Sequence, residues 1–405
     1  MIDRVKLGPQ LRPPNTNIVA QTHRRNSDEI KVFIHLGPGF GAAKWFKRYE
    51  RGLIPGLNEP LPYGYYRARG DGLWIEYSED ADEGPITSFL RRSLCQVAGF
   101  DVIHAWRNRE GLLNADIVWA HTEREHLAAL LLFSLLAPDK RPSIIAQCIW
   151  LFDQWPRFGW VRRSIYVWLL RRADIVTTLS PENLNAARRL LPGSRTELVM
   201  FGVKSDSLRP PRRSPCRRPV RIGALGSDMH RDWKTLLRAF GGIQDFELRI
   251  ASAKVSPRST RGASNVEVEP ARTEEQVKML YEWADIIVVP LNPNLHASGL
   301  SVILEATIFG LPVISTDTGG LRAYFSNEEV HYVPIADALA MRRAGRELAE
   351  DDERRFRLAD AAQRRIVEGG LSSERYALRH RRLSQELLGQ TRLQVPLSLG
   401  RQSSG

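Results

Sequence analysis

The chain of 405 residues contains little cysteine, and Cys95, Cys148 and Cys216 are scattered without pairing or metal-ligand spacing. A disulfide framework and a cysteine zinc site are therefore not expected, and a reducing cytoplasm is the default compartment. No apolar run approaches the roughly 18 residues that a membrane-spanning helix requires. The first residues lack an apolar core and a small-residue cleavage site, so no signal peptide is predicted.

Acidic residues are too few to balance the basic ones: 46 Asp and Glu face 58 Lys and Arg, a net charge of +12. This excess predicts attraction to polyanions such as phosphorylated substrates, anionic lipid or nucleic acid. Nucleic-acid binding is not expected, because the sequence has no helix-turn-helix, zinc-finger or RNP-like pattern. A hydrophobic content of 43% and a charged content of 26% exclude a largely disordered or fibrous chain.

The chain alternates strand-like and helix-like segments in two successive blocks. The blocks span 31–205 and 220–372, and a Pro- and Arg-rich segment at 206–219 is the predicted linker. A loose polar arm at 1–30 precedes them. Alternating strands and helices predict parallel sheets covered on both faces, so we expect two Rossmann-like, doubly wound α/β domains. Ligands of such sheets bind beyond the carboxyl ends of the strands, which places the predicted site in a cleft between the domains.

Local patterns in the first block give more detailed predictions. Residues 51–90 hold many Gly, Pro and Tyr and little periodicity, which indicates long loops with one strand at 73–77. Residues 100–105 are predicted to form a strand, and a further strand is predicted at 115–120, before a helix at 123–136.

The most informative segment is 281–321, where a strand, a loop ending in Ser298-Gly299 and a helix follow one another. Ser298 is a plausible N-cap, and the backbone N–H groups beside it would form an anion site suited to a diphosphate. Glu305 lies about two helical turns further on the same face, alone among apolar residues. A buried carboxylate needs hydrogen-bond donors, which a ribose diol or an internal salt bridge would supply.

This segment resembles the signature of the large retaining "group 1" family of GT-B glycosyltransferases, which use sugar nucleotides. The similar elements read WADIIVVPL, then SG, then VILEATIFGLPVISTDTGGL. Glu305 matches the family's second Glu, which holds the nucleotide ribose. The family's first Glu would fall at Ala297, so the chain departs there, and His296 is the nearest polar candidate. The resemblance is specific in the second block and loose in the first.

A second motif, at 223–240, also takes its meaning from the resemblance. In the family this turn carries a Gly-Arg pair and then a Lys whose cations meet the donor phosphates. The corresponding positions imply that Ser227 replaces one cation and that Arg231 keeps the other, with Lys234 assisting. Without the resemblance, Arg231 would be interpreted as a solvated surface arginine. A guanidinium forks onto phosphate oxygens and would stabilise the departing diphosphate. The predicted donor-binding residues are Gly39, Gly41, Gly226, Ser227, Arg231, Lys234, His296, Ser298, Gly299, Leu300 and Glu305.

The first block offers a Gly-rich turn at 37–41 after its first strand. It weakly matches a dinucleotide fingerprint, but Glu59, about twenty residues on, lies in a Pro-rich loop, so a nicotinamide dehydrogenase is a poor alternative. In the resembled family such a turn lets the backbone approach the donor or the acceptor; otherwise it is a tight turn alone.

The predicted catalytic residues are His121, Gln147, Asp153 and Arg231. His121 ends a strand on the cleft side. Gln147 stands one strand later, where families of this kind often carry a His that contacts the donor hexose. Asp153 would act as acceptor base if it faces the cleft.

Two further features concern metals and membranes. Asp80-Ala-Asp82 has the form of a metal-binding D-x-D but sits in an acidic loop, so no metal and no cofactor are predicted. In 156–172, arginines interleave with apolar and aromatic residues and no acid. As a helix this segment suits an anionic membrane surface, or alternatively a domain helix with its arginines in solvent.

The resemblance implies hexosyl transfer from a nucleotide-diphosphate sugar to a saccharide or polyprenyl-linked saccharide, with retention, in synthesis of bacterial polysaccharide or cell-surface glycan. It also implies that a helix at 373–390 packs back on the first domain, ahead of a frayed tail at 391–405. We expect a cytoplasmic enzyme, peripheral at the inner face of the plasma membrane if the basic helix binds lipid. The missing first Glu and missing Arg leave open a catalytically silent sugar-nucleotide-binding or partner subunit.

Overall fold

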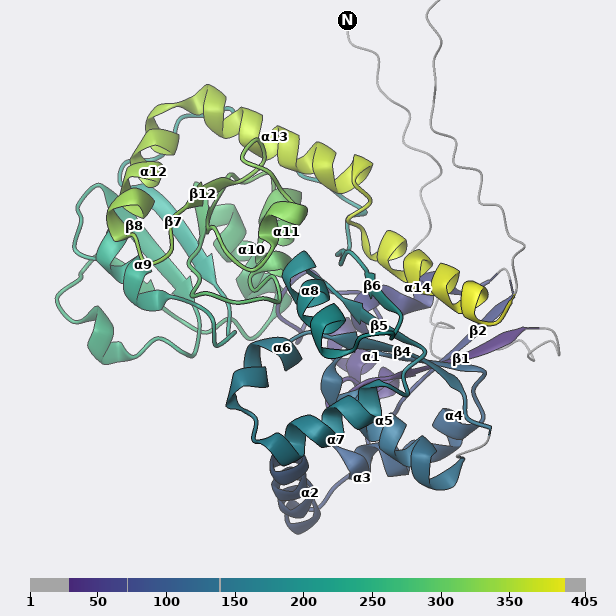
Figure 1. The fold of residues 1–405 in the computed structure, drawn as a ribbon. Coiled ribbons are helices and arrows are strands. Elements are labelled where there is room, and N and C mark those ends of the chain that lie inside the picture. The colour runs from purple at the N-terminus through teal and green to yellow at the C-terminus, as the bar shows by residue number, and fades with distance from the viewer. Residues whose placement is uncertain (1–28, 71, 138–139, 390–405) are drawn as a thin grey trace, which may run out of the picture.

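The computed structural model describes residues 29–70, 72–137 and 140–389, which form two α/β domains (Figure 1). The predicted tail at 391–405 lies outside the described residues, as does nearly all of the predicted arm at 1–30. Each domain contains one six-stranded sheet in which every strand pair is parallel. The prediction of two Rossmann-like, doubly wound domains is confirmed.

The first sheet has the strand order β2-β1-β3-β4-β5-β6. Its strands are β1 (Ile30–His35), β2 (Leu73–Tyr77), β3 (Ile117–Ala120), β4 (Ser143–Cys148), β5 (Ile175–Thr178) and β6 (Thr196–Leu198). Its helices are α1 (Ala42–Glu50), η2 (Pro62–Ala68), α2 (Pro85–Ala98), α3 (Val102–Arg107), α4 (Arg109–Leu113), α5 (Glu123–Leu136), α6 (Leu151–Gln154), η3 (Trp155–Arg157), α7 (Trp160–Leu170) and α8 (Pro181–Leu190). Strands β3 and β5 are buried along their whole length, as expected where helices cover both faces of a parallel sheet.

The second sheet has the order β12-β11-β10-β7-β8-β9. Its strands are β7 (Val220–Leu225), β8 (Phe246–Ala251), β9 (Val266–Val268), β10 (Ile286–Val289), β11 (Val313–Thr316) and β12 (His331–Val333). Its helices are α9 (Trp233–Phe240), η4 (Pro257–Thr260), α10 (Glu274–Trp283), α11 (Leu300–Ile308), η5 (Leu321–Ala323), α12 (Ala338–Glu350) and α13 (Asp352–Glu368). Strands β10 and β7 are neighbours, so the loops that follow them lie side by side and can build one site.

The last helix, α14 (Ser373–Leu387), packs on the first domain. Trp119 Nε1 donates to Ser384 Oγ at 2.8 Å, and the hydroxyls of Tyr65 and Tyr376 lie 2.8 Å apart. Figure 1 shows α13 and α14 following one another from the second domain to the first. Among the described residues, none of the helices combines the length and apolarity needed to span a bilayer.

Two local predictions in the first domain were wrong. Residues 100–105 do not form a strand, because the Asp101 side chain accepts from His104 N at 2.9 Å and caps α3. The segment 51–90, predicted as loops with one strand, also contains η2 and the start of α2. Helix α2 begins with Pro85 and ends at left-handed Gly99, and its apolar residues recur at helical spacing although none of them is buried.

Candidate active site

Arg231 lies in the turn between β7 and α9, at the edge where the carboxyl ends of the strands meet. The turn is tied to the neighbouring loop by a β-bridge between Arg231 and Leu291, and Asn292 N donates to His230 O at 2.7 Å. The Arg231 side chain is only 7% exposed, so it is not a solvated surface arginine.

Two glycines make room for this guanidinium. A Cβ on Gly226 would lie 2.3 Å from Arg231 Nε, and a Cβ on Gly299 would lie 2.5 Å from Nη1. Both glycines have positive φ, 137° and 84°, which other residues rarely adopt. The backbone is therefore shaped around the arginine on two sides.

The guanidinium has unused donors. Among the described residues, Arg231 Nε and Nη1 are buried without a hydrogen-bond partner, and no carboxylate forms an ion pair with Arg231. Burial lowers the pKa of Arg231 to about 10, so the side chain still carries its charge at neutral pH. A buried cation without a partner is costly, and an anion between these N–H groups would remove the cost.

The prediction that Ser298 caps α11 was wrong. The N-cap position is Gly299 in the left-handed conformation, with no side-chain cap. Ser298 N donates to Asn294 Oδ1 at 3.0 Å and Leu300 N donates to Ala297 O at 3.1 Å, so these two amides bond within the loop. The Ser298 hydroxyl is buried without a partner, which leaves its side chain rather than its amide free for a ligand.

Glu305 on α11 is buried and hydrogen-bonded on both oxygens. Leu57 N donates to Oε1 at 3.0 Å, and the Tyr281 hydroxyl donates to Oε2 at 2.8 Å. Burial raises the pKa of Glu305, although these two donors oppose the shift. Among the described residues, no basic side chain forms a salt bridge with Glu305; instead the 52–58 segment of the first domain covers the carboxylate, with Gly56 packed against it.

His296 connects the two domains. Its Nδ1 lies 2.7 Å from Asp153 Oδ2, and its Nε2 lies 3.0 Å from Asp228 Oδ2. Burial would lower the pKa of His296, but the two carboxylates raise it to about 9. Asp153 also accepts from Leu295 N at 2.7 Å, so it faces the cleft but is fully engaged with the second domain.

A cavity of about 1020 Å³ opens beside these residues. It is lined by the first domain, including Tyr63, His121 and Glu125, and by Ser227 and Asp228 of the second. The His121 ring stacks on Tyr63 with centroids 3.4 Å apart. Its Nδ1 forms a hydrogen bond with Tyr65 Oη at 2.9 Å. Burial holds the pKa of His121 well below its usual range, so the ring is neutral.

Gln147 is fully buried in a network of side chains rather than at the cavity wall. Its Nε2 donates to His121 O at 3.0 Å, and its Oε1 accepts from the Tyr376 hydroxyl at 2.7 Å. The structure thus makes Gln147 a link between β4 and α14, which orients His121 from behind.

The glycine turn at 37–41 and the acidic loop that contains Asp80 contact one another. Gly39 N donates to Asp80 Oδ1 at 2.9 Å, and a Cβ on Gly41 would lie 2.4 Å from Asp80 N. Neither Gly39 nor Gly41 lines the cavity, although residues between and before them do. Lys234 is exposed on α9 and is not brought together with the other predicted residues.

Sequence reasoning missed several residues of this site. Glu125 faces the cavity, and burial raises its pKa to about 7. Its carboxylate accepts from Thr122 N at 2.7 Å in a capping box, so the T-x-x-E pattern after β3 was the available signal. Tyr281, Asp228 and the 52–58 segment had no sequence signal, because their contacts join distant parts of the chain.

Comparison with known proteins places this geometry in a class. Sucrose-phosphate synthase of Thermosynechococcus elongatus has a similar structure, with a TM-score of 0.66 at 16% identity over 89% of this chain and 100% of that chain. HepE of Anabaena, solved with UDP and glucose, gives a TM-score of 0.59 at 13% identity over 87% of this chain and 98% of that chain. Both likenesses define a GT-B fold. No curated protein is significantly similar to this chain in sequence.

The family is given by the second domain. Residues 219–351 match the family described as glycosyl transferases group 1. The second domain is therefore a group 1 glycosyltransferase domain, of the kind that uses nucleotide sugars. The resemblance stated from the sequence is confirmed.

Proposed function

We propose that this enzyme transfers a hexosyl group from a nucleotide-diphosphate sugar to a saccharide or lipid-linked saccharide, with retention, in the synthesis of a cell-surface glycan. The observation that carries the proposal is the buried, unpartnered guanidinium of Arg231, around which Gly226 and Gly299 are shaped. A diphosphate supplies the missing acceptors at this point. The UDP bound to HepE, which has a similar fold, supports a nucleotide donor.

The residues would divide the work as follows. Arg231 and the Ser298 hydroxyl hold the diphosphate, and Glu305 accepts from the ribose hydroxyls after the contact with Leu57 N is released. The bond from the sugar C1 to the diphosphate oxygen breaks, and a bond to the acceptor oxygen forms on the same face. The acceptor proton passes to the leaving diphosphate oxygen, whose developing charge Arg231 stabilises.

Access to the donor site requires a local movement. The 52–58 segment covers Glu305, and Gly52 O accepts from Glu274 N at 2.9 Å, so the segment is attached to the second domain at two places. Elsewhere on the first domain, Asp153 forms a third contact between the domains, through Leu295 and His296. A nucleotide that binds Glu305 must replace the first of these contacts.

The cavity of the first domain is the proposed acceptor site, and a lipid-linked acceptor fits the surface beside it. Helices α2 and α7 meet there: Arg162 donates to Val97 O at 2.6 Å, and the Tyr166 hydroxyl donates to Ala98 O at 3.0 Å. Large apolar side chains project outward from both helices, namely Ile86, Phe89, Leu90, Leu94 and Val97 on α2 and Trp160, Val161, Ile165 and Trp168 on α7. We call these residues the α2–α7 patch.

Exposed arginines accompany the patch, including Arg92, Arg157 and Arg171. Apolar side chains beside cations suit the surface of an anionic membrane. Because residues of α2 and α7 also line the cavity, a membrane-bound enzyme would receive its acceptor at that surface.

The donor proposal is tested with radiolabelled UDP- and GDP-sugars, measuring binding and then transfer to saccharide and polyprenyl-linked acceptors. We expect saturable binding and transfer, both strongly reduced in Arg231→Lys and unchanged in Arg238→Lys, an exposed arginine on α9, the helix that follows Arg231. Binding without turnover across all donors and acceptors would instead identify a silent sugar-nucleotide-binding subunit. No nucleotide binding at all would contradict the proposal.

The membrane proposal is tested separately by co-sedimentation with vesicles. We expect binding to phosphatidylglycerol vesicles, weaker binding to phosphatidylcholine vesicles, and loss of binding in Trp160→Ser/Phe89→Ser. Met279→Ser, at an exposed apolar position on the second domain, is the control. Equal sedimentation of the patch variant and the wild type would remove the patch from the proposal.

A further inference from the structure

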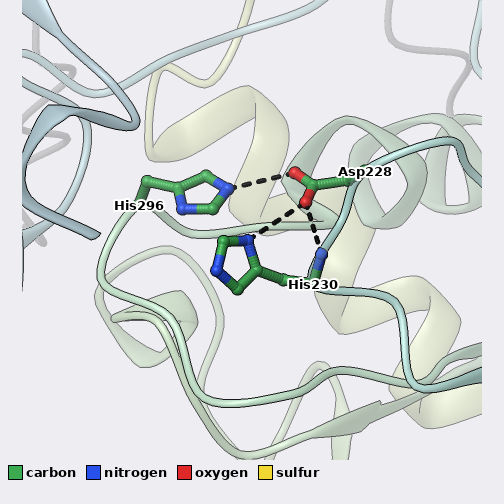
Figure 2. A group of neighbouring side chains, drawn as sticks. All are labelled: Asp228, His230 and His296. Atoms are coloured by element: carbon green, nitrogen blue, oxygen red, sulfur yellow. Dashed lines mark hydrogen bonds and ion pairs between the residues drawn. The ribbon is translucent and has the colours of Figure 1, made fainter. Parts of the chain in front are cut away.

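Two loops of the second domain bring a compact group of ligand atoms together. Asp228 and His230 belong to the turn after β7, and His296 belongs to the loop after β10 (Figure 2). One ligand atom of each residue lies within 4.8 Å of the others. Within the described ranges, no other trio of His, Cys, Asp or Glu side chains converges in this way.

The contacts inside the group place nitrogen atoms around one carboxylate. His230 Nδ1 lies 3.2 Å from Asp228 Oδ1, and His296 Nε2 lies 3.0 Å from Asp228 Oδ2. The two loops are fixed to one another by the hydrogen bond from Asn292 N to His230 O. Figure 2 shows both rings turned toward Asp228.

A fourth residue orients one of the rings from behind. Asp153 Oδ2 lies 2.7 Å from His296 Nδ1, and Asp153 is itself fixed by Leu295 N. A histidine that binds a metal usually donates its other ring N–H to a carboxylate, which sets the tautomer and aims the free nitrogen at the ion. Asp153 places His296 in this arrangement, with Nε2 directed at Asp228 and His230.

We propose that Asp228, His230 and His296 bind a divalent metal ion, with Zn²⁺ as the best match. Two imidazole nitrogens and one carboxylate oxygen are a ligand set that zinc adopts where a further position stays open. Asp228 lines the cavity between the domains, so the open position faces that cavity.

The ligand that would occupy the open coordination position can be inferred from the residues beside it, an inference that rests on the proposed function. Ser227 and Asp228 line the cavity, and Arg231 follows Asp228 by three residues in the same turn. A phosphate oxygen of a nucleotide held by Arg231 is the chemistry that this position would accept. Metal binding itself does not depend on that assignment.

The first experiment titrates Co²⁺ into the full-length protein after treatment with a chelator, and follows the visible d–d absorption. We expect saturation at one Co²⁺ per chain and displacement by Zn²⁺, with both signals lost in His230→Asn and Asp228→Asn. Asp153→Asn should keep the stoichiometry and weaken affinity about 10- to 100-fold, as for a residue that orients a ligand.

The control is His331→Asn, since His331 lies on β12 and contacts Arg354 rather than this group. Circular dichroism and thermal melting of each variant distinguish lost ligands from lost folding. Absence of a stoichiometric cobalt signal in the wild type would overturn the proposal. An unchanged signal in folded His230→Asn and Asp228→Asn would overturn it equally.

A second measurement separates this proposal from the glycosyltransferase donor site. UDP added to the cobalt-loaded protein should shift the visible spectrum. An unshifted spectrum at saturating UDP would contradict the claim that a nucleotide phosphate occupies the open coordination position. Arg231-dependent UDP binding in a protein that takes up no Co²⁺ would overturn the metal site alone. Co²⁺ binding without any nucleotide binding would support the metal site and contradict the proposed function.

Discussion

The two sides of the cleft differ in whether their buried polar groups have hydrogen-bond partners. On the first domain, His121, Gln147 and Tyr376 bond to one another and to neighbouring residues. On the second domain, the Arg231 guanidinium and the Ser298 hydroxyl are buried without partners. Since an unpaired buried polar group costs free energy, the first arrangement stabilises the fold, and the second is complete only with a ligand.

A second buried arginine sharpens this comparison. Arg355 on α13 is 4% exposed, but it donates to Leu348 O at 2.7 Å, to Ser214 O at 2.9 Å and to Asp352 Oδ1 at 2.6 Å. Arg355 therefore has a structural role that can be read from its contacts. Arg231 has similar burial and lacks them, which is why burial alone does not distinguish a structural cation from a ligand-binding one.

The largest effect is expected from Arg231→Met. Loss of a group that stabilises a leaving oxygen should lower kcat about 10²- to 10³-fold. The free energy of unfolding should stay unchanged or rise, because an unpaired buried charge is removed.

Arg355→Met should show the opposite pattern: stability falls by about 1–3 kcal/mol while nucleotide binding is retained. Transfer assays and denaturant unfolding of both variants check the comparison. Similar losses of stability in the two variants would show that Arg231 is structural as well.

Glu305→Gln is expected to weaken nucleotide affinity about 10- to 100-fold, since a hydrogen bond to a charged group contributes about 1.5–3 kcal/mol. Calorimetric titration with UDP and GDP measures the change. The same proposal predicts faster hydrogen exchange at the Leu57 amide when nucleotide binds, because its acceptor is taken by the ribose. Unchanged affinity together with an unchanged Leu57 amide would remove Glu305 from the donor site.

On the first-domain side, Gln147→Leu should act on stability rather than on donor binding. It leaves the Tyr376 hydroxyl without its acceptor and His121 O without a donor, at a cost of about 1–3 kcal/mol. Denaturant unfolding and UDP titration of the same variant separate the two effects. A large loss of UDP affinity with normal stability would give Gln147 the direct donor role considered from the sequence.

The smallest effect is a pH dependence from Glu125. Burial raises its pKa to about 7, above the usual 4.5; Glu123 adds to the shift, and the Thr122 contacts oppose it. The folded chain then binds the proton that the unfolded chain releases, so stability falls as pH rises from about 4.5 to about 7 and levels off above. Unfolding measured against pH should lose this slope in Glu125→Gln and keep it in Glu110→Gln, an exposed control.

Much of the fold was predictable because it depends on local patterns. The strand β10 and the helix α10 (Glu274–Trp283) before it follow from apolar runs and periodicity. Helix α2 was missed although its apolar residues have helical spacing, because its first turns were included in the Gly- and Pro-rich segment 51–90 that was predicted as loops. Helix α3 was taken for a strand, because its short apolar run is ambiguous without the Asp101 cap.

The sequence by itself determined two parallel α/β domains, the position of Arg231 after a strand and the position of Glu305 on the helix after the next motif, since these depend on residue spacing along the chain. Only the tertiary structure decided which buried groups have partners. Leu57 and Glu305 are 248 residues apart, and Asp153 and His296 are 143 apart. Such contacts leave no trace in local periodicity, because they depend on how the two domains are placed against each other.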